Sequence, residues 1–330
     1  MPHAAAVVFR DFNDSERDLL VRAARTVLSE VGSPLDPTVH LFLRRALTWL
    51  PAPLAEKLGN ASSPSGLTIF RGVFRVDDVA LGDTPEHWAK ARGDELWDIL
   101  VLLLSTALGR PIAFPDRQEG RFVLNLMPCA RRNTGPDAAN DARLGMLRTE
   151  DAFHPRRAHF LLMACMRNHG ALLTSAASIR HISPAEDDID ILMRPHLPIH
   201  PGSDRTPAHF AGRPTPVPVL WSTDEGLMMR FDPGRTPLQE ASPEFGRAYG
   251  HLAEALANAT LHCDLGAGDV LVVENDVVAL SSAPIAARGH GGDQWVKRAL
   301  VHSLLGARRR PAAEAEEHGY GHKPLVAELG

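Results

Sequence analysis

An arginine and a glutamate stand two residues apart near the middle of the chain, at Arg148 and Glu150. Side chains at positions i and i+2 of a β-strand point to the same face, so an extended segment here would bring both charges into one site. The guanidinium could then hold an anionic group of a substrate, while Glu150 acts as a base or anchors an ammonium group. A salt bridge that only fills a pocket is the other interpretation, and the spacing leaves both open.

Sequence signatures of several large enzyme classes are absent. No GxGxxG, P-loop, GxSxG or HExxH pattern occurs, which disfavours dinucleotide enzymes, nucleoside triphosphatases, elbow-type serine hydrolases and zincins. The formal net charge of −5 disfavours a general nucleic-acid binder. The longest apolar run, over 99–104, is too short to cross a bilayer, and the N-terminus lacks the pattern of a signal peptide. We therefore predict a cytoplasmic protein that binds neither nucleic acid nor membrane.

Apolar periodicity divides the chain into a helical first third and a strand-rich remainder. Helical spacing predicts helices over 19–28, 39–50 and 86–108, with a strand over 67–73 between them. Two further helices are expected to start at Ser183-Pro184 and at Ser242-Pro243, where a capping residue precedes proline. Short apolar runs separated by turns predict strands over 121–127, 159–166, 171–179, 216–221, 269–275 and 295–305, the last of which could also be helical. This order favours a β-barrel or a double-sheet jelly roll.

Four blocks of sequence resemble the clavaminate synthase-like branch of the Fe(II)/2-oxoglutarate oxygenases, which includes arginine β-hydroxylases. LRTEDAFHP (147–155) is similar to the family's HTExAFHP motif. GDVLVVENDVVALSSAPIAARGHGGDQWVKR (268–298) is similar to its GDxLxxDNxxxxHGRxPFxxRYDGxDRWLxR block. GRFVLNLMP (120–128) and ALLTSAASI (171–179) resemble further runs in the same order. The resemblance implies a mainly β chain with α, built on a double-stranded β-helix (jelly roll, cupin-like) core with N-terminal and inserted helices.

The expected organisation is one jelly-roll domain over 1–310, whose first 110 residues or so form the helical part. The proline-rich segment over about 194–215 is predicted to be a lid loop. The polar segment 311–330 is predicted to be a flexible tail.

The resembling blocks depart from the family where it holds its cofactors. The resemblance implies an iron site made of a His-x-Glu/Asp pair and a distal His. Arg148 stands at the first His, Glu150 keeps the carboxylate, and Leu280 stands at the distal His. Gln294 stands where the family has the arginine that pairs with 2-oxoglutarate. Because arginine has no lone pair for a metal and leucine is no ligand, we predict that canonical iron and 2-oxoglutarate binding are lost, with no metal and no cofactor.

Other charged residues fall on positions that the resemblance implies for substrate binding. Arg298 falls on the arginine that binds the substrate carboxylate in arginine hydroxylases. Asp232 falls on the first aspartate of an Asp-Gly-Asp that grips the guanidinium, but the second aspartate is replaced by Gly234. Arg288 matches a further family arginine. Their simpler interpretations are a surface arginine for Arg298, a residue of an Asp-Pro turn for Asp232 and a structural arginine for Arg288. The candidate substrate-binding residues are thus Asp232, Arg298, Arg288 and Gln294.

The predicted function is an iron-independent enzyme that performs a non-oxidative step, such as cyclisation, elimination, isomerisation or condensation. Its substrate would be a small amino-acid-derived metabolite of specialised metabolism, and Glu150 and Arg148 would be catalytic. One alternative is a non-catalytic relative that binds a ligand or partner. Another is an oxygenase with an atypical metal site around Glu150, drawing on histidines at 181, 196, 200 and 209. A homo-oligomer or a complex with a pathway enzyme is left open.

Overall fold

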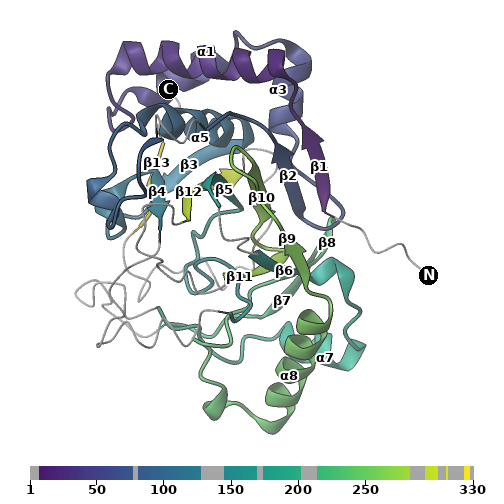
Figure 1. Cartoon of the computed structure of the whole chain (residues 1–330). Coiled ribbons are helices and arrows are strands. Elements are labelled where there is room, and N and C mark those ends of the chain that lie inside the picture. Colours follow the sequence, from purple (N-terminus) through teal and green to yellow (C-terminus); the bar gives the residue numbers. More distant parts are fainter. Residues whose placement is uncertain are drawn as a thin grey trace.

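The computed structural model describes residues 7–76, 81–127, 145–168, 174–201, 214–282, 294–303, 310 and 323–327. Four helices form a layer over one face of a large central sheet, and two more lie beside smaller sheets on its other side (Figure 1). The upper layer contains α1 (Asp14–Val31), α2 (Val39–Leu47), α3 (Ala52–Gly59) and α5 (Glu95–Leu108). The lower pair is α7 (Glu186–Leu192) and α8 (Pro243–Asn258).

The large sheet follows the order β1-β2-β10-β5-β12-β3-β13, with β4 paired to β12 off this path. Only β1 and β2 pair in parallel there; all the other neighbours among the described strands of this sheet run antiparallel. Its strands are β1 (Val8–Asp11), β2 (Leu67–Arg71), β3 (Gly109–Ala113), β4 (Val123–Leu126), β5 (Phe160–Arg167), β10 (Val270–Glu274), β12 (Trp295–Ser303) and β13 (Leu325–Val326).

A second sheet, in the order β11-β6-β9, lies on the side away from the helical layer (Figure 1). It is made of β6 (Thr174–Ser178), β9 (Leu261–Cys263) and β11 (Val278–Ser282), and the pair β7 (Leu220–Thr223) and β8 (Gly226–Met229) forms a separate hairpin. The long antiparallel pairs confirm the predicted architecture, mainly β with α. The ambiguous run at 295–305 is a strand, β12, because it pairs with β5 on one side and with β3 and β4 on the other.

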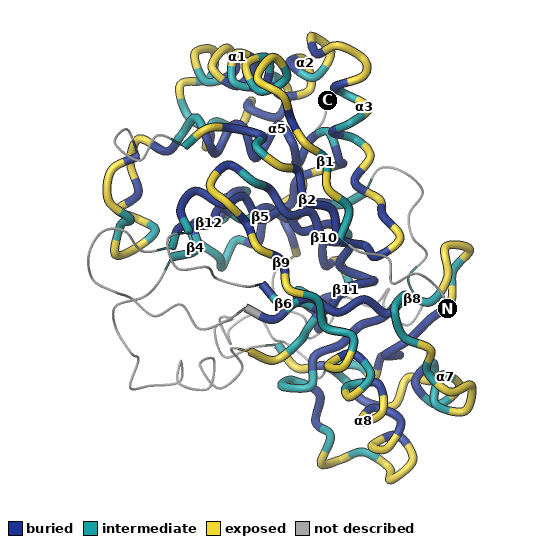
Figure 2. Tube along the Cα trace, turned by 45° about the vertical axis from the view of Figure 1, so that its right-hand side comes forward, coloured by how far each residue is buried: buried dark blue, intermediate teal, exposed yellow. Residues whose placement is uncertain are grey.

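Alternation along the central strands separates two cores. On β10, Val270 and Val272 pack toward the helices, whereas Leu271 and Val273 pack toward the second sheet. This two-residue period follows from strand geometry, and both faces are apolar because both are covered. Figure 2 shows the central strands buried, whereas the exposed residues lie on the outer faces of the helices and in the loops.

Three helix starts show what the sequence could and could not predict. The helix expected from Ser242-Pro243 begins as predicted, since the Ser242 side chain accepts a hydrogen bond from the Phe245 backbone N–H at 3.2 Å. The capping prediction at Ser183 is wrong, because α7 starts at Glu186 after an extended Ala185 with no side-chain cap. The helix predicted over 86–108 starts only at Glu95, after Gly93 adopts a left-handed φ of 72°.

The predictions for the lid and the tail concern segments that are described only in part. Residues 202–213 and most of 311–330 lie outside the described residues, so these remain predictions. Within the tail, Leu325 and Val326 pair with β3 as β13. None of the helices in the described parts is long and apolar enough to cross a membrane.

His40 on α2 should make the fold sensitive to acid. Burial lowers the pKa of His40 to about 4, whereas an unfolded histidine titrates near 6.5. The unfolded chain therefore gains a proton first, and stability falls as the pH drops from about 6.5 to about 4. Urea unfolding at pH 7.0 and 4.5 should show that His40→Phe removes about 2–3 kcal/mol of this loss. Equal losses in the two proteins would contradict the assignment.

Candidate active site

The segment around Arg148 runs alongside β11. The Arg148 backbone N–H donates to the Leu280 carbonyl at 2.9 Å, and the Leu280 N–H donates back to the Arg148 carbonyl at 2.8 Å. The Thr149 N–H donates to the Phe231 carbonyl at 2.8 Å, and the Phe231 N–H donates to the Thr149 hydroxyl at 3.1 Å. Two sequence blocks that are 132 positions apart thus meet as one short antiparallel bridge.

Glu150 is the centre of a cluster of ions. Its Oε1 lies 3.0 Å from Arg117 Nη1 and 3.0 Å from Arg298 Nη1. Arg117 also donates to both oxygens of Asp151, at 2.6 and 3.1 Å. Arg298 stands on β12, where strand pairing holds its backbone, while Arg117 lies in the loop after β3. Glu150 and Arg298 therefore come together as candidate site residues, and Arg117 joins them.

The charges around Glu150 favour its ionised form. Burial by itself would raise the pKa of Glu150, but the guanidinium groups of Arg298, Arg117 and Arg148 outweigh burial and hold that pKa below its usual range. Three cations face two carboxylates, those of Glu150 and Asp151, so the cluster carries an excess of positive charge. Such an arrangement suits the carboxylate of a ligand.

Asn275 fixes the backbone of Glu150. The Asn275 Oδ1 accepts from the Glu150 N–H at 2.7 Å, and its Nδ2 donates to the carbonyls of Glu150 and Ala158, both at 2.9 Å. The next residue, Asp151, has a left-handed φ of 49°, which is uncommon for a residue with a Cβ. Strained backbone held by surrounding bonds is typical of sites where a side chain must be aimed.

The other predicted site residues lie less close to Glu150 or outside the described parts. Asp232 is 5% exposed and follows Phe231, which bonds Thr149; its carboxylate lies 3.8 Å from Arg235 Nε. Gln294 is half-buried immediately before β12. Arg288 lies outside the described residues. The roles of these residues remain predictions.

Sequence reasoning missed Arg117 and the clamp made by Asn275. Arg117 follows β3 in a turn where nothing in the spacing marks it as functional. Asn275 had a weak signal, a polar residue directly after the apolar run of β10, but its partner Glu150 is 125 positions away. Only the pairing of distant strands brings these residues together.

The described side chains do not fit a three-ligand iron centre. No group of three His, Cys, Asp or Glu residues that could hold a metal occurs among them. Glu150 is a carboxylate, but Arg148, two positions before it, and Leu280, which pairs with Arg148 across the bridge, cannot be ligands. Two guanidinium groups already bond Glu150.

No family model matches the chain. Among curated proteins, it is 26% identical to an L-ornithine/L-arginine 3-hydroxylase of Catenulispora acidiphila over 76% of this chain and 81% of that one. It is 28% identical to an L-asparagine oxygenase of Streptomyces coelicolor over 93% of this chain and 92% of the relative. It is 24% identical to clavaminate synthase 2 of Streptomyces clavuligerus over 83% and 87% of the two chains.

Solved structures show a likeness to the same group of enzymes. The non-heme iron oxygenase OrfP in complex with Fe and α-ketoglutaric acid superposes with a TM-score of 0.78 at 25% identity, over 95% of this chain and 99% of that one. The same enzyme with Fe, succinate and (3S)-hydroxy-L-Arg gives 0.78 at 26% identity, over 90% and 94%. The relatives of this chain are clavaminate synthase-like amino-acid oxygenases. The predicted jelly-roll fold is confirmed.

Two predictions are corrected by these relatives. The iron-independent, redox-neutral function is wrong, because the relatives are named hydroxylases and oxygenases of amino acids. The prediction of no cofactor is wrong as well, because the clavaminate synthase-like neighbours bind Fe, succinate and α-ketoglutaric acid. Both predictions depended on three side chains, Arg148, Leu280 and Gln294, whereas the likeness extends along nearly the whole chain. The relatives are enzymes, which favours catalysis over a purely binding role.

Proposed function

We propose that this protein is an oxygenase of the clavaminate synthase-like group and that it acts on a free amino acid or a close derivative. The ionic cluster around Glu150 carries the proposal. An amino acid brings a carboxylate and an ammonium group, and the cluster offers both guanidinium groups and carboxylates within one site. The likeness to amino-acid oxygenases over up to 93% of the chain supports the same reaction class.

Arg298 is the residue that we assign to the substrate carboxylate. Its Nη1 holds Glu150, but its Nε is buried and has no hydrogen-bond partner among the described residues. A buried N–H without a partner is costly, and a ligand carboxylate would satisfy it. Arg148 adds positive charge from the neighbouring segment, and Asp232 is the candidate for a cationic group on the substrate. Arg288 and Gln294 are further candidates for contact with the substrate.

We further propose that Arg148 and Leu280 occupy the positions of two histidine ligands in the relatives, and that Gln294 occupies that of the arginine for 2-oxoglutarate. The mutual backbone bonds of Arg148 and Leu280 support this equivalence, because two ligands of one metal must be neighbours in space. When bound, iron with 2-oxoglutarate supplies the oxidising power in such enzymes. The described residues do not fit a three-ligand iron centre. This chain's own residues bind and orient the substrate. A cytoplasmic location and a homo-oligomer also remain proposals.

The proposal predicts succinate formation that depends on an amino acid. Purified protein with Fe(II), 2-oxoglutarate and oxygen would be incubated with each proteinogenic amino acid and with ornithine, and succinate and hydroxylated product would be measured. We expect turnover with a narrow set of amino acids, and a loss of about 100-fold or more in Glu150→Gln. Omitting Fe(II) is the control. A folded protein that makes no product with any amino acid would overturn the proposal.

A further inference from the structure

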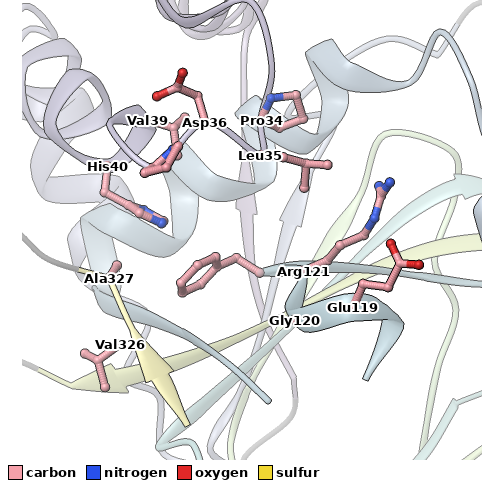
Figure 3. Close-up of a pocket in the computed structure, with 12 residues that line it drawn as sticks. Pro34, Leu35, Asp36, Val39, His40, Glu119, Gly120, Arg121, Val326 and Ala327 are labelled. Atoms are coloured by element: carbon pink, nitrogen blue, oxygen red, sulfur yellow. The ribbon is translucent and has the colours of Figure 1, made fainter. Parts of the chain in front are cut away.

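A cavity of about 390 Å³ opens between the helical layer and the β13 edge of the large sheet (Figure 3). It is lined by the loop before α2 with the first turn of that helix, by residues 119–122 before β4, and by Val326 and Ala327 at the end of the chain. None of the lining residues is among the partners of Glu150 given above. The cavity therefore shares no lining residue with the ionic cluster around Glu150.

The walls of this cavity are mainly apolar. Two prolines, Leu35, Val39, Phe122 and the end of β13 contribute them. Ligand sites of this kind combine apolar walls with a few polar groups that fix the orientation of the ligand.

His40 is the polar group in the wall. It is 4% exposed, and neither ring nitrogen has a hydrogen-bond partner in the part of the chain that is described. Its ring meets Phe122 edge-on at a centroid distance of 4.5 Å, and Figure 3 shows it turned toward the interior of the cavity. Burial lowers the pKa of His40 to about 4, so at neutral pH one nitrogen donates and the other accepts. Buried polar groups normally have partners, so His40 is suited to one from a ligand.

Arg121 supplies a second orphaned donor, since its Nε is buried and without a hydrogen-bond partner among the described residues. The carboxylates in the wall belong to Asp36 and Glu119. Asp36 accepts from both the N–H and the hydroxyl of Thr38, and Glu119 is exposed. Two carboxylates beside one guanidinium do not favour an anion, so a neutral ligand fits this wall better.

We propose that this cavity binds a small neutral hydroxyaromatic molecule of the phenol type. The ring lies against the apolar walls, and the hydroxyl, which can both donate and accept, bonds a nitrogen of His40.

Phenol itself is the first probe, titrated into the full-length protein by calorimetry and followed by ligand-observed NMR. We expect saturable binding that is about tenfold weaker in His40→Phe, which keeps a ring but removes both nitrogens. Toluene, which lacks the hydroxyl, should bind this variant at least as well as the parent. A parallel titration with L-tyrosine distinguishes two kinds of ligand. If L-tyrosine binds more tightly than phenol, the ligand is a free amino acid, and if it binds more weakly, the ligand is a simple phenol.

Two further variants test the position of the ligand without changing His40. Val326→Trp adds bulk to the wall that β13 contributes, at a residue that is 37% exposed, and it should weaken phenol binding. Glu150→Gln alters the other site and should leave phenol binding unchanged. Failure of phenol to saturate, or equal binding by His40→Phe and the parent, would overturn the proposal.

Discussion

Replacing Asp276 with alanine is expected to lower the free energy of unfolding by about 3–5 kcal/mol. The Asp276 side chain is fully buried and lies 2.9 Å from Arg157 Nη2, whose side chain is also fully buried. Arg310 approaches from the C-terminal part of the chain, with Nη2 at 3.0 Å from Asp276 Oδ2. Removing the carboxylate leaves two guanidinium groups in the interior with no counter-ion at that point, which is the costly way to break a buried pair. Chemical denaturation of parent and variant measures the difference.

Asp14→Ala is the matched control. Asp14 also bonds two arginines, Arg17 and Arg75, but its side chain is 73% exposed. Such a surface pair contributes about 1 kcal/mol or less. If both substitutions cost the same, the buried network is not what stabilises this region.

The effect of Asp276 should also depend on pH. Burial alone would raise the pKa of Asp276, but Arg310 and Arg157 outweigh burial and hold that pKa far below its ordinary range. A carboxyl whose pKa is lowered by folding stabilises the folded state above its unfolded pKa of about 4, and this contribution is lost as the pH falls further. The difference between Asp276→Ala and the parent should therefore be full at pH 7 and shrink below about pH 4.

Local patterns predicted the elements of this fold better than their ends. Short apolar runs predicted β5, β10 and β12, because both faces of each strand are covered and the apolar residues are therefore continuous. β13 was missed because two residues carry no period, and its position depends on pairing with β3 across more than 200 positions. The helix predicted to begin at Glu86 begins only at Glu95, because Gly93 just before α5 adopts a left-handed conformation.

The site was harder to predict than the fold, since its contacts join distant parts of the sequence. The tripeptide Glu274-Asn275-Asp276 was visible as a polar end to an apolar run. Glu274 bonds Ser62 and Arg180. Asn275 bonds the Glu150 backbone, and Asp276 bonds Arg157 and Arg310. These partners lie 34 to 212 positions away, so no local pattern could assign them. Arg148 and Leu280 lie opposite each other across a short bridge, but the side-chain types at these two positions and at Gln294 did not determine the reaction class.

Asn275→Ala should uncouple Glu150 from the scaffold. The amide satisfies three backbone groups, the N–H and carbonyl of Glu150 and the carbonyl of Ala158, and Asn275 itself is 2% exposed. Leaving buried groups unpaired costs about 1–3 kcal/mol each, partly recovered by relaxation, so we expect a loss of about 3–5 kcal/mol in the free energy of unfolding. Because Asn275 touches Glu150 only through its backbone, it is a positioning residue.

A structural role and a positioning role differ in what else changes. With the Glu150 N–H no longer bonded to Oδ1, amide hydrogen exchange over 145–155 should quicken under native conditions, well below the threshold of global unfolding. In the turnover assay, kcat should fall about 100-fold while KM changes little, since a misplaced Glu150 disturbs the reacting geometry more than ground-state binding. Asn168→Ala is the control, because its amide donates at 2.8 Å to the Leu265 carbonyl, on a different part of the fold. Unchanged exchange over 145–155 in Asn275→Ala, with stability alone reduced, would show that Asn275 supports the core and does not aim Glu150.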